Sequence, residues 1–162
     1  MQTFARQAIF AMFMVGSLWL YSTSAQAADP LVGTWKLDAA KSKFIPGPAP
    51  KSITVTFEAA GEDGVKVTAD VVTADAKTTH TTYTGNYDGK DYPITGAATG
   101  ADTVSLRRID ARTTERIDKK DGKVVMTFTR QVSGDGKTLM VTVKGTNSKG
   151  QPVNDVVTLA KQ

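Results

Sequence analysis

Cysteine is absent from the sequence of 162 residues, and histidine occurs once, as His80. Without cysteine the chain forms no disulfide, no thiolate metal site and no thiol nucleophile. His80 stands in the stretch KTTHTTYTG with no carboxylates at ligand spacing, and no Gly-x-Ser-x-Gly motif offers a serine nucleophile. We therefore expect no metal, no cofactor, no catalytic residue and no enzymatic activity.

Charge of one sign is also scarce, because 20 Lys and Arg stand against 16 Asp and Glu. Seven basic residues lie between Arg107 and Lys123, but four acidic residues are interleaved with them. This alternation is typical of a solvated pair of strands, the alternative being a face that binds anions or nucleic acid. We expect no nucleic-acid partner.

Long hydrophobic runs are confined to the N-terminal region. Arg6 precedes an apolar run from Ala8 to Leu20, and the small residues Ala25-Gln26-Ala27 follow it. The run is short for a membrane span, whereas its flanks are typical of a secretory signal peptide. We expect residues 1–27 to be removed by cleavage near Ala27, residues 28–162 to form one domain, and the mature protein to be periplasmic or secreted.

The rest of the sequence alternates between apolar and polar residues, with many β-branched side chains. The stretch SITVTFEA places Ile53, Val55 and Phe57 on one face, and VKVTADVV does the same from Val65 to Val71. A period of two is typical of half-buried antiparallel strands. Turn signals separate the runs, and four of them are Asp-Gly pairs, which favour tight hairpin turns.

Ten short runs joined by tight turns predict an up-and-down meander, which removes its edges by closing into a barrel. We therefore predict an all-β fold, a single antiparallel barrel of about 8–10 strands. A soluble barrel is favoured over a membrane barrel, because the outward positions carry Thr, Lys, Asp and Glu. The expected strands cover residues 33–38, 52–59, 65–73, 77–86, 90–95, 103–110, 113–119, 123–133, 138–145 and 153–160.

One connection breaks this rhythm, the stretch DAAKSKFIPGPAP at residues 38–50. It has room for one helical turn before its prolines impose an extended path. It either covers one mouth of the barrel or is a plain surface connection.

The stretch TFTRQVSGDGKTLMVTV contains the Gly-Lys-Thr string of a phosphate-binding P-loop. A P-loop needs glycine five positions before Gly136, where Gln131 stands, and a helix after it, where an alternating strand follows. The stretch therefore predicts a hairpin with its turn at Asp135-Gly136.

The first strand of this hairpin carries an arginine on its apolar face, since Met126, Phe128 and Arg130 alternate there. A buried guanidinium needs an anionic or hydrogen-bonding partner. Arg108 repeats the pattern after Val104 and Leu106, so two inward arginines are candidates to hold an acidic head group. The alternative for Arg130 is a structural role, stacked on the Trp35 ring and bonded to strand carbonyls.

The stretch LVGTWKL, residues 31–37, resembles the Gly-x-Trp opening strand of the calycins, which include lipocalins, fatty-acid-binding proteins and avidins. Thr129-Arg130 is similar to the Thr-Arg of fatty-acid-binding proteins, and this resemblance implies that Arg130 contacts a lipid carboxylate in the cavity. Val157 and Leu159 occupy the positions where that family completes its carboxylate clamp. Residues 35–38 and 41–50 also resemble exported bacterial lipocalin-like proteins.

These features predict an exported lipocalin-like protein that binds a small, mainly apolar molecule, with or without an acidic group, inside the barrel. The expected partner is hydrophobic or amphipathic, and no insertion into a membrane is expected. One alternative is a barrel with a filled core that contacts envelope partners through its loops or basic strands 107–123, and another is an acid–base enzyme without metal. The expected ligand contacts are Arg130, Arg108, Phe128 and Met126, and the expected structural residues are Gly33 and Trp35.

Overall fold

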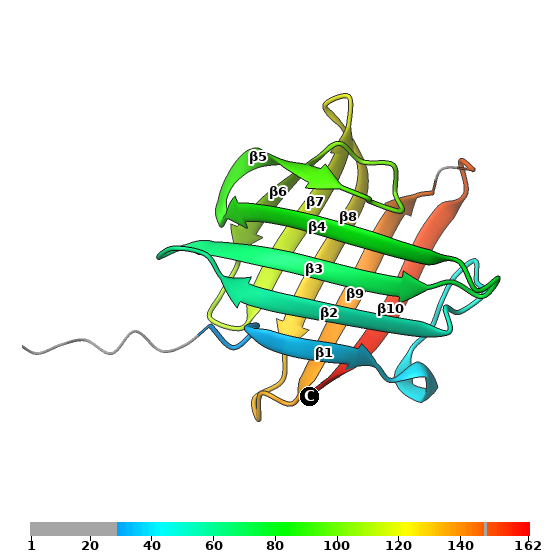
Figure 1. Ribbon diagram of the computed structural model, residues 1–162, viewed down its shortest axis with the longest axis horizontal. Helices are drawn as coiled ribbons and strands as arrows, with labels where there is room; N and C mark the ends of the chain where they lie inside the picture. Colours follow the sequence, from blue (N-terminus) through cyan, green and yellow to red (C-terminus); the bar gives the residue numbers. More distant parts are fainter. Residues whose placement is uncertain (1–28, 148) are drawn as a thin grey trace, which may run out of the picture.

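The computed structural model describes residues 29–147 and 149–162, and the expected signal peptide, residues 1–27, lies outside the described residues. The described chain forms ten antiparallel strands and one short 3-10 helix (Figure 1). Their bounds are β1 Gly33–Leu37, η1 Ala39–Lys41, β2 Ser52–Ala59, β3 Gly64–Val72, β4 Thr78–Asn86, β5 Asp88–Thr95, β6 Thr103–Arg108, β7 Thr113–Lys120, β8 Lys123–Val132, β9 Thr138–Thr146 and β10 Pro152–Lys161.

The strands close into one barrel, so the predicted fold class is confirmed. Neighbours along the chain pair with each other from β1 to β10, and β1 pairs with β10 to complete the circle (Figure 1). Register pairs such as Val55↔Ala69 bring residues of the same parity together across strands. The apolar faces read from the sequence in β2 and β3 therefore both face the interior, as the alternation predicted.

The predicted hairpin between β8 and β9 is present. Gly136 adopts a φ of +70°, a conformation that glycine accepts readily, and its N–H donates to the Ser133 carbonyl at 3.0 Å. The Asp135 carboxylate accepts from the Lys137 N–H at 3.1 Å, and β9 begins one residue later. Lys137 thus ends the hairpin turn and Thr138 opens β9, and neither belongs to a phosphate loop.

One end of the barrel is closed by residues 29–32, the segment before β1, which we call the plug. Trp35 is 0% exposed, and its indole N–H donates to the Leu31 carbonyl at 2.8 Å. Gly33 has a φ of +128°, and a Cβ there would lie 2.9 Å from Cε of Lys161. Gly33 and Trp35 thus lie at the closed end, and their structural role stays a prediction.

The connection from β1 to β2 lies along the barrel wall and continues over its opposite end. The Lys43 N–H donates to the Val156 carbonyl at 2.7 Å, and the Asn154 N–H donates to the Ile45 carbonyl at 2.9 Å. Residues 43–45 therefore pair with β10 where β1 has ended. We call residues 42–50 the strap. The strap lies at the mouth of the barrel, in line with the first of the two alternatives drawn from the sequence, a segment that covers one mouth.

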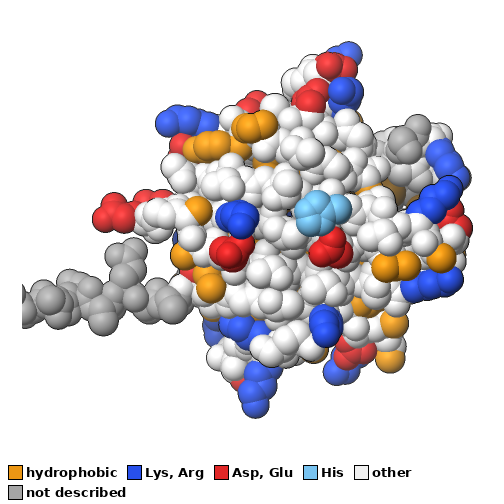
Figure 2. Space-filling view, in the orientation of Figure 1, with side chains coloured by type: hydrophobic (Ala, Val, Ile, Leu, Met, Phe, Trp, Pro, Cys, Tyr) orange, Lys and Arg blue, Asp and Glu red, His pale blue; other side chains and the backbone are white. Residues whose placement is uncertain are grey.

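The outer face of β2, β3 and β4 is mostly uncharged (Figure 2). Its charged groups lie in pairs, Lys66 with Glu58 at 2.9 Å and His80 with Asp70 at 2.7 Å. His80 is exposed, and among the described residues no three His, Asp or Glu side chains are grouped to hold a metal ion. In the same part of the chain no helix is long and apolar enough to cross a membrane.

Candidate ligand-binding cavity

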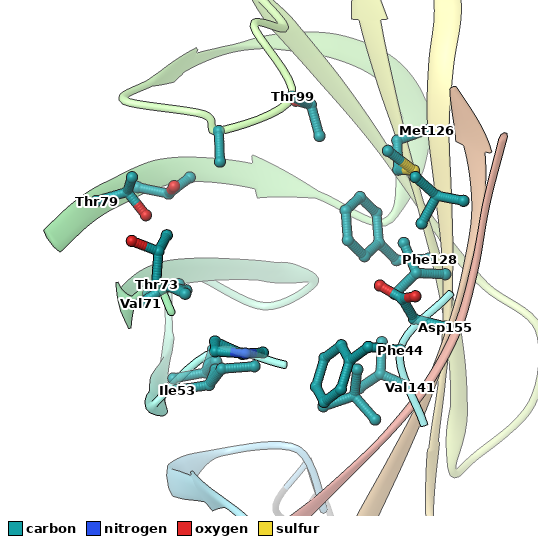
Figure 3. A pocket seen from close by; sticks show the side chains of 18 of the residues that line it. Phe44, Ile53, Val71, Thr73, Thr79, Thr99, Met126, Phe128, Val141 and Asp155 are labelled. Atoms are coloured by element: carbon teal, nitrogen blue, oxygen red, sulfur yellow. The ribbon is translucent and has the colours of Figure 1, made fainter. Parts of the chain in front are cut away.

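The barrel interior is hollow rather than filled, with a cavity of about 680 Å³. Its walls come from nearly every side of the barrel, and Figure 3 shows threonines on the side of β3 and β4 facing Phe128, Met126 and Val141. The mouth lies among the strap and the β3–β4, β5–β6 and β9–β10 connections. The aliphatic lining is Ile53, Val55, Val67, Ala69, Val71, Leu139, Val141, Val143, Val153, Val157 and Leu159.

Strand β8 supplies three of the residues proposed from the sequence. Met126, Phe128 and Arg130 all line the cavity, because positions two apart in a strand share one face. Their lining position agrees with the parity argument, and their contact with a ligand stays a prediction.

Arg130 is 4% exposed and carries no neutralising partner among the described residues. Its Nη2 donates to the Tyr83 hydroxyl at 2.8 Å, and its guanidinium carbon lies 5.2 Å from the centre of the Phe57 ring. Nη1 has no hydrogen-bond partner, and no described carboxylate lies within ion-pair distance. An unneutralised buried charge is costly, so this position favours an anion from outside the chain.

The structural alternative for Arg130 named the wrong partner. Trp35 is covered instead by Lys161, whose Nζ lies 5.0 Å from the ring centre. Trp35 belongs to the closed end, while Arg130 reaches Tyr83 and Phe57 at the inner part of the cavity.

Arg108 does not line the cavity, contrary to the expectation from strand parity. Its Nη2 lies 2.6 Å from Asp29 Oδ2, and its guanidinium stacks over the Tyr87 ring at 4.3 Å. Arg108 is the last residue of β6, and the plug before β1 provides a carboxylate outside the cavity. The expected inward orientation of Arg108 is therefore corrected to a contact that ties the plug to β6.

Two charged residues in the interior were missed from the sequence, Arg116 and Asp118 of β7. They are 7% and 0% exposed, and Arg116 donates through Nε and Nη2 to the two Asp118 oxygens, the second at 2.7 Å. The interleaved charges of residues 107–123 had suggested solvated strands, which is wrong for this pair. The signal was the spacing of two, which places opposite charges side by side on one face.

The aromatic rings around these arginines hold the guanidinium planes in place. Arg116 lies between Tyr83 and Phe128, with its guanidinium carbon 4.8 Å and 4.5 Å from the ring centres. Tyr83 thereby contacts both arginines, one through its ring and one through its hydroxyl. Stacking of this kind favours a cation at the ring face.

Tyr87, over whose ring Arg108 stacks, has a buried hydroxyl with no hydrogen-bond partner among the described residues. Burial raises the pKa of Tyr87 to about 12, and the positive charge of Arg130 opposes the shift only in part. The side chain therefore stays a neutral phenol at every physiological pH.

The raised pKa of Tyr87 predicts a loss of stability in alkali. The folded state holds the proton up to about pH 12, while the unfolded chain releases it near pH 10. The unfolding free energy is unaffected by this group below about pH 9.5 and should fall by about 1 kcal/mol between about pH 9.5 and pH 11, as the unfolded chain releases the proton. Urea unfolding of the wild type and of Tyr87→Phe measures this, and an equal loss in both proteins would contradict it.

The mouth carries three charged side chains of mixed sign, Asp75, Lys149 and Asp155. Asp155 Oδ1 accepts from the Ile45 N–H of the strap at 2.7 Å, and Figure 3 shows its carboxylate beside Phe44. Burial raises the pKa of Asp155, and the hydrogen bond from Ile45 opposes this. The strap is thus fastened to β10 where a ligand would enter.

No protein-family model matches the sequence, and no curated protein matches it significantly. Among solved structures, the fluorescent protein UnaG is 17% identical, with 81% of this chain and 96% of UnaG covered and a TM-score of 0.54. A single-residue variant of UnaG is 16% identical over 82% of this chain and 96% of its own, with a TM-score of 0.55. A weaker likeness, with a TM-score of 0.47, is to the zebrafish ileal bile acid-binding protein, 12% identical over 82% of this chain and 99% of that protein.

These likenesses concern the arrangement of strands, since the identities are too low to compare sites. In this chain the strands follow one another around the barrel in the order of the sequence, and Gly33-Thr34-Trp35 opens β1. The chain has the closed antiparallel barrel fold of the calycins, as its opening strand and its meander predicted.

Proposed function

We propose that this chain is an exported, non-enzymatic carrier that binds one small, mainly apolar molecule inside its barrel. The observation that carries the proposal is the cavity of about 680 Å³, which is open at one end and lined mostly by aliphatic and aromatic side chains. Small-molecule sites are commonly cavities of this size with a few polar groups among apolar ones. Export rests on the sequence features of residues 1–27.

An acidic group on the ligand is favoured by Arg130. Its buried, unneutralised guanidinium lies on the cavity lining, where an anion would form a charge-assisted hydrogen bond. The apolar part of the ligand would then extend from Arg130 along the aliphatic walls toward the strap. An amphipathic monocarboxylate or a similar anion has the required chemistry.

The alternative, a filled barrel that contacts partners through basic strands 107–123, has less support. It required an interior packed with side chains, and the interior is hollow. Its basic strands are also largely compensated: Lys119 pairs with Asp91 at 2.6 Å, and Lys120 pairs with Asp102 at 3.3 Å. Arg116, which that face would have used, is buried.

A cavity-filling variant tests the proposal. Ala69 lines the cavity on β3, and tryptophan in its place would occupy the space of the ligand. We expect the apolar anionic dye 8-anilinonaphthalene-1-sulfonate to bind the wild type at one site and to bind Ala69→Trp at least about tenfold more weakly, since overlap with the ligand outweighs the added apolar area. Titration of the dye fluorescence measures this.

Ala160→Trp is the matched control, because Ala160 is exposed on the outer face of β10. It should bind the dye as the wild type does, and circular dichroism should show both variants folded. Equal dye binding by a folded Ala69→Trp protein would place the dye outside the barrel and contradict the proposal.

A further inference from the structure

We propose that Asp118 sets the charge of the ligand, making the cavity selective for molecules with a single negative charge. The inference rests on the proposed function, because it assigns a specificity-determining role within the same cavity. Asp118 itself touches no ligand in this account; it acts through Arg116.

Both carboxylate oxygens of Asp118 are already occupied by hydrogen bonds from other side chains. Its side chain is 0% exposed, and Oδ1 and Oδ2 accept from Nε and Nη2 of Arg116. Oδ2 also accepts from the Thr99 hydroxyl at 3.0 Å, and Thr99 belongs to the β5–β6 connection at the cavity mouth. Donors on both oxygens hold this carboxylate in place beside Arg116.

Arg116 would otherwise present a second positive charge to the ligand. It lines the cavity together with Arg130, and both contact Tyr83. Two guanidinium groups around one tyrosine form a site for a doubly charged anion, as phosphate-binding arginines do. Asp118 prevents the binding of a doubly charged anion, because its carboxylate neutralises the charge of Arg116.

The charged side chains of the inner cavity then have a net charge of one positive unit. Arg116 and Arg130 are positive and Asp118 is negative, while Tyr83, Phe128 and Thr99 around them are neutral side chains. The cavity lining has three other charged residues, and they lie at the mouth, on the connections between strands or beside the strap. They are Asp75, Lys149 and Asp155. A singly charged head group at Arg130 balances the interior, and a second negative charge has no counter-charge there.

Three probes with the same tail test this on the wild type: decyl sulfate with one negative charge, decyl phosphate with about two at pH 8, and uncharged decanol. Sulfate and phosphate share a tetrahedral shape, so the comparison isolates the charge. Isothermal titration calorimetry should show decyl sulfate binding at least about tenfold more tightly than either of the others.

Substitutions that change the charge count should move this preference in a fixed order. Asp118→Asn leaves two positive charges and should shift the preference toward decyl phosphate. Arg116→Gln leaves the positive charge of Arg130 balanced by Asp118, a net charge of zero, and should bring decanol level with decyl sulfate. The double variant Arg116→Gln/Asp118→Asn restores one positive charge, so it should again prefer decyl sulfate. Asp70→Asn, on the exposed outer face of β3, is the control and should behave as the wild type does.

A purely structural role for Asp118 would lower the affinity for all probes together or unfold the protein, without reordering them. If Asp118→Asn does not fold, the wild-type order and the double variant decide. A wild type that prefers decyl phosphate, or a double variant that keeps no preference for decyl sulfate, overturns the inference while carrier function stands. A wild type that binds none of the three probes counts against the proposed function itself.

Discussion

Arg130→Met weakens the binding of decyl sulfate roughly 10- to 100-fold, while the unliganded variant is as stable as the wild type or more stable. The affinity falls because the ligand loses a charge-assisted hydrogen bond in a buried setting. The stability holds because methionine removes a buried, unneutralised charge at the loss of one hydrogen bond to Tyr83 and of the stacking on Phe57. Calorimetric titration and urea unfolding of the same preparation measure the two effects.

This combination separates a ligand contact from a structural arginine. A structural Arg130 would give the opposite result, with a loss of about 2 kcal/mol or more in unfolding free energy and little change in affinity. Arg107→Met on the exposed outer face of β6 is the matched control, and both of its values should stay at the wild-type level.

Trp35→Ala lowers the free energy of unfolding by about 3–5 kcal/mol, the largest loss of stability that we expect from one substitution. Trp35 fills the closed end of the barrel, and its indole N–H holds Leu31 in the plug at 2.8 Å. Alanine leaves a large cavity and an unpaired Leu31 carbonyl. Because the variant lacks this indole, urea unfolding followed by circular dichroism is the measurement.

Trp35→Phe keeps most of the buried area and loses the hydrogen bond, so it should cost roughly 1–2 kcal/mol. Ile109→Ala removes an exposed apolar side chain and should change stability by less than about 0.5 kcal/mol. A Trp35→Ala protein as stable as Ile109→Ala would show that the plug does not hold the barrel closed.

The fold was largely predictable because each local signal agreed with the others. Alternation in SITVTFEA and VKVTADVV fixed the inward faces of β2 and β3, and the Asp-Gly pair at 135–136 marked the β8–β9 turn. The one helical turn expected before the prolines is present as η1. Where the strap lies was not predictable, since its position depends on hydrogen bonds to β10 from the far end of the chain.

The inward side chains of the site were predictable only where strand parity pointed inward and the residue also lay within its strand rather than at its end. Arg130 lies within its strand between Phe128 and Val132, apolar neighbours at two-residue spacing, so its inward position followed from the strand. Arg108 has the same parity, but it ends its strand, where Asp29 of the plug competes for it. Arg116 and Asp118 were missed because their spacing of two shows that they share one face of β7 but not that this face is the inner one. Only the closed barrel buries them.

Native mass spectrometry of the protein purified from its own host is the most direct test of whether the barrel holds a small acidic ligand at Arg130. We expect one small molecule per chain in the wild type, released as an anionic amphiphile on extraction with organic solvent, and its loss from a folded Arg130→Met protein. Repeated recovery of the wild type with an empty barrel, or of an Arg130→Met protein that keeps the same molecule, would contradict it.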